Sequence, residues 1–527
     1  MSKSLSSRHQ LAVGLAVILV IVQAIGMAIL PAALNDWFLT TPDAGGWACG
    51  AQTLADTGAF SDGHTAGLGY NFNVCWDDHT YPGLQYLLAA SIQVTGLAGS
   101  TLIPPVLTIA LVGLALTMMM IGWKLSQSLW VATFAGLATS ATPIVLRSLI
   151  LTPQNLFGYW LIALLLLTII QLVESKRWWW WLVVVTIAGM LGYVHSLSFG
   201  VAGLSCALWF YCWYLPNWWW RLGILVAGAL GALVIWQFPD LLPVSPQNAI
   251  ALFTSGGFAG YDHPLYDHPA FLGYGLVAVA GIGLLFATIT SKTSKGLLIS
   301  WLVVPTLLGH LSLIGWILMP DRFIAYIWFS CVVLAALGLE RLRHLITWSV
   351  PAWLGMAILL WGAQLVHAIV YVQDDVSGWS DRFKPHPEFV EALQWLNQQD
   401  ERGTLVGIMA AANREIIFSP IWYDGPVASY PWYNLNHRNL KSFKANSSLY
   451  QGIFADTANP EYLRVQAFYY LLTKPNSAEA LTATQQYHLS YLILPKGSQA
   501  DEIWEHAAVQ QFNQVYENTK YRLYQLN

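Results

Sequence analysis

Eleven long apolar runs constrain this chain more than any other feature of its sequence. Each run holds at least 17 mostly apolar residues, close to the roughly 20 that cross a hydrocarbon core as a helix. A helix also pairs its own backbone polar groups, which a spanning segment must do. We therefore predict eleven membrane-spanning helices, at about 10–30, 102–122, 129–147, 155–172, 178–194, 196–214, 221–237, 271–291, 296–319, 323–340 and 350–372.

The composition agrees with a polytopic α-helical membrane protein. Hydrophobic residues make up 56% of the 527 residues and charged residues only 10%, against about 25% charged in typical soluble domains. A net charge of −4, with no run of Lys or Arg, excludes a nucleic-acid partner. Disordered, collagen-like and disulfide-scaffold classes are excluded by the same figures.

The basic residues predict the orientation. With a cytoplasmic N-terminus and an uncleaved first span, eight Lys and Arg residues near span ends lie inside, and only Arg147 and Arg322 lie outside. The apolar stretch 82–98 is shorter, and counting it as a span would destroy this asymmetry, so we assign it to an outer loop. We expect an integral protein of the plasma (inner) membrane with its C-terminal part outside.

The C-terminal part has a different pattern. It has ordinary charge and alternates a helical stretch at 387–400 with short apolar strands such as Thr404–Met409, which predicts an exocytoplasmic α/β domain. The expected parts are a transmembrane part at 1–372, with a large first outer loop at 31–101 and a second outer loop at 238–270, and a soluble part at 373–527.

Two cysteines, Cys49 and Cys75, lie in the first outer loop. Because disulfides form outside the cytoplasm, we predict one between them, closing a 27-residue loop. Two free thiols are the alternative.

The first outer loop is rich in Asp and has no Lys or Arg. A carboxylate near a span end has water on one side and an apolar wall on the other, which favours a role as general base. Asp43 and the group Asp77, Asp78 and His79 are the candidates, with plain solvation of the loop as the alternative. Solvation is the interpretation we favour for the remaining three, Asp36, Asp56 and Asp62.

Several short motifs of this loop resemble the GT-C glycosyltransferases, which are polytopic enzymes that use polyprenyl-phosphate-linked sugars. Asp43 follows the first span, the pattern Ala51-x-x-Leu54-x-x-x-Gly58 comes next, and Tyr81-Pro82-Gly83 opens a surface helix. The expected orientation, large first loop and outer C-terminal domain are also similar to that superfamily. The resemblance implies that Asp43 is the catalytic carboxylate.

Arg322, in Pro320-Asp321-Arg322-Phe323, precedes the tenth predicted span. An Arg at a membrane interface is costly unless it is paired or hydrated, and its planar fork suits a phosphate. In the oligosaccharyltransferase branch an Arg at a similar place contacts the lipid-linked pyrophosphate, so the resemblance implies that Arg322 binds the donor phosphate. Interfacial snorkelling, or a pair with Asp321, is the alternative, and Arg147 is a second candidate for the phosphate.

Histidines mark further pocket candidates. His195 begins the sixth predicted span, where similar histidines recur in the superfamily, although hydrogen bonding at the interface is the alternative. The second outer loop repeats Tyr-Asp-His-Pro at 261–264 and 266–269. These ligand types suit a metal such as Zn²⁺, but we favour a turn-rich loop that caps the sugar pocket. The predicted pocket residues are His79, His195, His263 and Asp267.

Two departures separate this chain from oligosaccharyltransferases. Their acidic pair after the third span is replaced by Thr152-Pro153-Gln154-Asn155. The segment Ile421-Trp422-Tyr423-Asp424-Gly425 matches their acceptor-recognition motif only in part and in a different order. Both departures favour simpler sugar transfer. No cofactor is expected, and a requirement for a divalent metal stays open.

The sequence thus predicts a membrane glycosyltransferase that moves a sugar from a polyprenyl-phosphate-linked donor to a lipid, glycan or protein at the outer face. Oligosaccharyltransferase-like protein glycosylation is one alternative, and a non-enzymatic lipid-linked-sugar transporter or scaffold is another. A transporter should show an internal repeat, and the two halves of this sequence show none.

Overall fold

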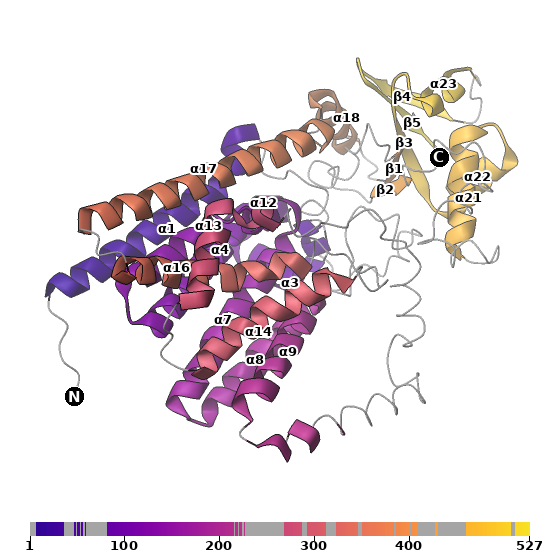
Figure 1. Ribbon diagram of the computed structural model, residues 1–527. Coiled ribbons are helices and arrows are strands. Elements are labelled where there is room, and N and C mark those ends of the chain that lie inside the picture. Colours follow the sequence, from indigo (N-terminus) through magenta and orange to yellow (C-terminus); the bar gives the residue numbers. More distant parts are fainter. Residues whose placement is uncertain are drawn as a thin grey trace. The chain divides into compact units, whose positions relative to one another are not determined.

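The computed structural model is predominantly helical, with a small sheet near the C-terminus (Figure 1). The residues that the structure describes are 7–35, 47–48, 50–52, 54–55, 58, 82–215, 217–219, 221–223, 226, 268–286, 292–311, 323–345, 350–383, 386–399, 403–408, 427–430, 460–506 and 512–526. Their contacts form two units, which are described separately. The first comprises Met1–Leu30, Leu107–Leu149 and Gln154–Asp374, and the second Pro31–Val106, Ile150–Pro153 and Asp375–Asn527.

Described helices lie in ten of the eleven predicted spans, although parts of 271–291 and 296–319 fall outside the described residues. The remaining span, 221–237, lies almost wholly outside them. Among the described residues, six helical segments have the length and composition to cross a membrane. They lie in α1 (Ser7–Asn35), α4 (Gly99–Ser126), α7 (Pro153–Ser175), α9 (Ser196–Trp209) with its continuation η1 (Phe210–Tyr214), η5 (Ala325–Ile327) with α16 (Trp328–Leu345), and α17 (Val350–Phe383). Three apolar segments are shorter: α8 (Trp179–Val194), α13 (Tyr274–Phe286) and the part Lys295–Gly309 of α14 (Lys292–Gly309).

The predicted span 129–147 is not one straight helix. It forms α5 (Leu129–Ser140) and α6 (Pro143–Leu151), which are bent by 44° at the break and qualify as a span only as a pair. Pro143 has no backbone N–H and therefore starts a new helix at N1 more readily than it continues an old one. The stretch 82–98 contains the separate 14-residue helix α3 (Pro82–Thr95).

The breaks in the apolar helices leave backbone carbonyls that accept hydrogen bonds from glutamine side chains. The Gln364 Nε2 donates to Ala141 O at the α5–α6 break (3.1 Å) and to Leu272 O (2.9 Å). Leu272 ends α12 (His268–Leu272), just before α13. Because an unpaired polar group in an apolar interior is costly, this side chain stabilises two helix breaks at once.

A second glutamine, Gln23 of α1, forms hydrogen bonds beside the α5–α6 break. Gln23 Nε2 donates to Leu137 O (2.7 Å) and to Ser140 Oγ (2.9 Å), while its Oε1 accepts from Trp361 Nε1 (2.8 Å). The two glutamines therefore connect α1, α5 and α17 by directional bonds, which apolar packing alone does not provide.

Small residues bring other helices into close contact. A Cβ added at Gly283 of α13 would lie 1.8 Å from Leu334 O, and one at Gly338 of α16 would lie 2.4 Å from Val279 O. Glycines at such crossings let two helix backbones touch, as in many membrane helix pairs. α8 and α14 both pack against α9 (Figure 1).

The C-terminal part is an α/β fold, as predicted. Its five-stranded sheet has the order β2-β1-β3-β5-β4. β1 pairs in parallel with β2 and β3, whereas β5 is antiparallel to β3 and β4. The strands are β1 (Thr404–Ile408), β2 (Val427–Tyr430), β3 (Leu489–Pro495), β4 (Asn513–Glu517) and β5 (Tyr521–Gln525).

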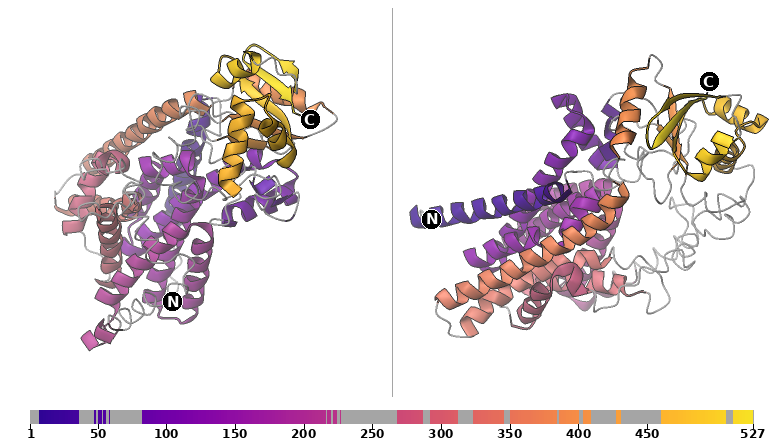
Figure 2. Two further views of the ribbon diagram at one scale, coloured as in Figure 1. Left: turned by 90° about the vertical axis from the view of Figure 1, so that its right-hand side faces the viewer. Right: turned by 90° about the horizontal axis from the view of Figure 1, so that it is seen from above.

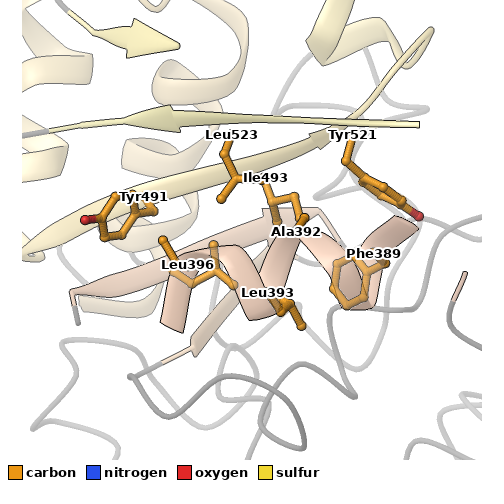
Figure 3. Packing of buried hydrophobic residues seen from close by; sticks show 9 residues of the cluster. Phe389, Ala392, Leu393, Leu396, Tyr491, Ile493, Tyr521 and Leu523 are labelled. Atoms are coloured by element: carbon orange, nitrogen blue, oxygen red, sulfur yellow. The ribbon is translucent and has the colours of Figure 1, made fainter. Parts of the chain in front are cut away.

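Helices cover both faces of this sheet (Figures 1 and 2). α18 (Pro387–Asn397) lies on one face, where Phe389, Leu393 and Leu396 pack against Ile493 and Leu523 of the strands (Figure 3). Successive strand residues point to opposite faces, so the alternate residues of β3 face the other helices, which are α21 (Pro460–Thr473), α22 (Ala478–Gln486) and α23 (Gln499–His506).

The bonds made by Gln364 predict a severe effect at Gly273. This residue has φ +101°, and a Cβ there would lie 1.9 Å from Gln364 Oε1. Gly273→Ala should therefore lower the free energy of unfolding by about 1–3 kcal/mol, seen as a lower thermal midpoint in detergent. Gly281→Ala in α13, where nothing lies within 4 Å, is the control, and an equal midpoint for the two variants would contradict this account.

Candidate functional site

The structure describes two of the site residues predicted from the sequence, His195 and Arg147. The others lie outside the described residues: Asp43, Cys49, Cys75, Asp77, Asp78, His79, His263, Asp267 and Arg322. The site that follows is therefore built outward from His195 and Arg147.

His195 lies at a break between two apolar helices. It ends α8 and caps α9, with an extended backbone (φ −158°, ψ 97°), and its own N–H donates to Leu191 O at 2.8 Å. Its Nδ1 accepts the N–H of Ser198 at 3.1 Å, which pairs one of the donors that a helix start leaves open. The side chain is only 4% exposed, so the interfacial histidine expected from the sequence is buried.

Two hydroxyl groups extend this cap into a network. Ser198 Oγ lies 2.7 Å from His195 Nδ1 and 2.8 Å from the hydroxyl of Tyr326, and that hydroxyl lies 3.5 Å from the same Nδ1. Tyr326 belongs to η5, the 3-10 turn that precedes α16. Since Ser198 and Tyr326 are buried as well, the network joins the α8–α9 break to the start of α16.

The proton position on His195 follows from the amide of Ser198. A ring nitrogen that accepts a backbone N–H cannot carry a proton itself, so neutral His195 has its proton on Nε2. In the bond between Ser198 Oγ and the Tyr326 hydroxyl, either group can be the donor. Hydrogen bonds linked in this way strengthen one another in an apolar interior.

Aromatic rings surround the Tyr326 end of the network. Tyr159 packs edge-on against Tyr326, with ring centroids 5.5 Å apart, and against Trp328 at 5.8 Å. Trp328 and Phe329 stack at 3.9 Å. All four rings are buried, so water does not compete for the hydroxyl groups of the network.

Arg147 lies in a different group of residues. Its guanidinium is 5.9 Å from the ring centroid of Phe271 in α12, within the range of a cation–π contact. Phe271 in turn packs against Tyr371 of α17 at 6.2 Å, and His367 Nε2 of α17 lies 3.0 Å from Ala270 O. The structure therefore places Arg147 beside the short helix that directly follows the predicted loop residue Asp267 in the sequence.

Sequence reasoning missed Ser198, Tyr326 and Gly158. The spacing of His195 and Ser198 carried one usable signal, because a helix-capping side chain bonds the N–H two or three residues later. Tyr326 carried no such signal, since it is 128 residues from its partner Ser198.

A separate pocket lies in the C-terminal domain, with a volume of about 490 Å³, between α23, β4 and β5. At its rim, Arg522 pairs with both oxygens of Glu505 (3.0 and 3.2 Å) and with Asp501 (3.0 Å). The hydrogen bond from Lys496, followed by that from Gln514, lowers the pKa of Glu517 to about 2. The bond to Glu505 raises the pKa of Arg522. The described charges at this rim are therefore paired with one another.

Metal binding finds no support within the described part of the chain. There, no group of three or more His, Cys, Asp or Glu side chains is arranged to hold an ion. α7 begins at Pro153 with Gln154 and Asn155 in its first turn, so this helix start carries no carboxylate.

The contact between α7 and the network predicts the effect of Gly158→Ala. A Cβ at this position would lie 2.6 Å from Ser198 Oγ and 3.3 Å from His195 Cβ. Helix propensity alone would favour Ala by about 1 kcal/mol, but the displaced Ser198 should reverse the sign and destabilise the protein by about 1–3 kcal/mol. Gly200→Ala in α9, with nothing within 4 Å, is the control. A thermal midpoint raised equally in both variants would contradict the packing described.

No protein-family model and no curated protein sequence matches this chain. Solved structures do. The chain is similar to ArnT from Cupriavidus metallidurans bound to undecaprenyl phosphate, with a TM-score of 0.58, 13% identity, and coverage of 97% of this chain and 98% of that one. It is similar to the oligosaccharyltransferase of Archaeoglobus fulgidus, with a TM-score of 0.57, 12% identity, and coverage of 91% and 69%.

The arabinofuranosyltransferase AftD from Mycobacteria is a third similar structure, with a TM-score of 0.52 and 13% identity; all of this chain matches 40% of that one. All three are GT-C glycosyltransferases. The resemblance predicted from the short motifs is thus confirmed as a resemblance of fold, and the apolar helices belong to an integral membrane protein.

Proposed function

We propose that this protein is a membrane glycosyltransferase that transfers a sugar from a polyprenyl-phosphate-linked donor to a glycan, lipid or protein acceptor at the outer face of the plasma membrane. The observation that carries the proposal is the likeness to a structure bound to undecaprenyl phosphate over nearly the whole length of both chains. A long apolar donor needs a site among membrane helices, and the described apolar helices would provide its surroundings.

Two residues of the sequence would carry the chemistry. Asp43 would act as general base and take the proton from the acceptor hydroxyl as this oxygen attacks the anomeric carbon of the donor. Arg322 would offset the charge that develops on the leaving phosphate. Asp77 and Asp78 are the carboxylates that would take the role of base if Asp43 does not.

His195 and Arg147 would line the site rather than react. His195 is held by Ser198 through Nδ1, which leaves the Nε2 edge as the donor side of the ring. Arg147 lies against α12. In the sequence, Asp267 directly precedes this helix, and His263 stands a few residues before it. His79 completes the proposed pocket.

Simple sugar transfer is favoured over oligosaccharyltransferase-like glycosylation of proteins. The start of α7 holds Gln154 and Asn155, where the oligosaccharyltransferase pattern has its acidic pair. The proposed reaction therefore assigns no step to a metal ion, and the C-terminal α/β domain would take part in binding the acceptor.

Asp43→Asn should lower sugar transfer by roughly 10²–10⁴-fold, the usual contribution of a general base, while donor binding survives. Arg322→Ala should instead weaken donor binding first, because it removes a charge that pairs with the phosphate. The measurements are transfer from polyprenyl-phosphate sugars by the purified protein in liposomes, and binding of the same donors.

Asp62→Asn is the matched control, since it changes a carboxylate of the same loop that we assign to solvation. Full turnover by Asp43→Asn would move the role of base to Asp77 or Asp78. Full turnover by each of the single variants Asp43→Asn, Asp77→Asn and Asp78→Asn would reject general-base catalysis by this loop.

The proposed outer location of the first loop predicts a disulfide between Cys49 and Cys75. Peptide mapping without reduction should join the two peptides that hold these residues, because an exocytoplasmic loop meets an oxidising environment. The described cysteines Cys206, Cys212 and Cys331 are free thiols and serve as internal controls for alkylation. Free thiols at both loop positions would contradict the disulfide.

A further inference from the structure

We infer that Ser198 and Tyr326, acting through Nδ1 of His195, are positioning residues of the donor site. Their hydrogen bonds would hold the 3-10 turn before α16 in a fixed place, and this turn begins three residues after Arg322 in the sequence. The inference rests on the proposed function, because it assigns these hydroxyl groups a purpose in binding the donor phosphate.

The start of α16 needs such support because its backbone is irregular. The helical residues Phe323 and Ile324 are followed by the 3-10 turn Ala325–Ile327, and only then by α16. A 3-10 turn has poorer hydrogen-bond geometry than an α-helix. The position of this turn therefore depends on contacts made by its side chains.

Tyr326 supplies the directional contact. Its ring packs against Tyr159, but an edge-on aromatic contact tolerates sliding and rotation far more than a hydrogen bond does. The 2.8 Å bond from its hydroxyl to Ser198 fixes the ring along its long axis. The turn is thereby connected to α9, an element more than 110 residues earlier in the chain.

Ser198 is itself fixed from two sides. Its N–H and its Oγ both lie within hydrogen-bond distance of His195 Nδ1, at 3.1 and 2.7 Å. α7 closes the other side, since Gly158 leaves no room for a Cβ beside Ser198 Oγ. A rigid anchor of this kind suits a binding residue, because small displacements of binding groups reduce affinity and rate strongly.

The test uses single-atom changes. Tyr326→Phe and Ser198→Ala each remove one hydroxyl oxygen from the network. His195→Asn keeps an acceptor that can cap Ser198 N–H, whereas His195→Ala removes it. The matched control is Ser330→Ala, because Ser330 is a buried residue of α16 whose Oγ donates to Leu298 O of α14 at 2.9 Å.

Two measurements are made on the full-length protein in detergent or liposomes. The first is hydrogen–deuterium exchange of the peptide that covers residues 323–328. Exchange should rise in Tyr326→Phe and Ser198→Ala, and it should stay near the wild-type rate in Ser330→Ala. The second is the kinetics of transfer, where KM for the polyprenyl-phosphate donor should rise roughly tenfold, the scale of one buried hydrogen bond, with kcat held within about twofold.

The conservative variant separates positioning from direct contact. His195→Asn should keep exchange at 323–328 close to the wild-type rate, because it keeps the cap of Ser198 N–H, while His195→Ala should raise exchange as Ser198→Ala does. Unchanged exchange at 323–328 in Tyr326→Phe would overturn the inference, and so would an equal rise of KM in Ser330→Ala. If the wild-type protein transfers no sugar from any such donor, the proposed function fails, and the exchange comparison still decides whether the network holds the turn.

Discussion

The structure depends on one constraint: backbone polar groups inside an apolar region must be paired, even where a helix breaks. Each break described here is paired by a buried side chain. Gln364 binds the carbonyls of Ala141 and Leu272, and His195 caps the start of α9. A broken helix leaves backbone N–H and C=O groups that need polar partners at depth. The cap that His195 makes with Ser198 is therefore found where two helices break.

These breaks would also let an apolar protein bind the charged donor that we propose. The network of His195, Ser198 and Tyr326 connects two elements by directional bonds within a wall of aromatic rings. Rigid placement of a few polar groups in a region without water is what stabilisation of a developing phosphate charge requires. Gly158 adds to this rigid placement, since it lets α7 approach Ser198 closely.

Much of this fold could be predicted from the sequence, because long apolar runs report directly on helices. The runs at 155–172 and 350–372 became α7 and α17, and the helical stretch at 387–400 became α18 of the α/β domain. The bend before Pro143 was missed, since an averaged apolar window takes no account of a single missing N–H. The partners of His195 and Arg147 could not be predicted either. Tyr326 lies 128 residues from Ser198 in the sequence. Contacts between residues so far apart depend on how the helices pack, and local periodicity carries no information about that packing.

The central claim is that a polyprenyl-phosphate sugar is the donor. It is tested most directly by incubating the purified wild-type protein in liposomes with a set of such donors and following the lipid by mass spectrometry. The account predicts that one donor is consumed and that free polyprenyl phosphate appears in equal amount, faster when an acceptor glycan, lipid or peptide is present. Folded protein that leaves every donor intact, with and without acceptors, would contradict it.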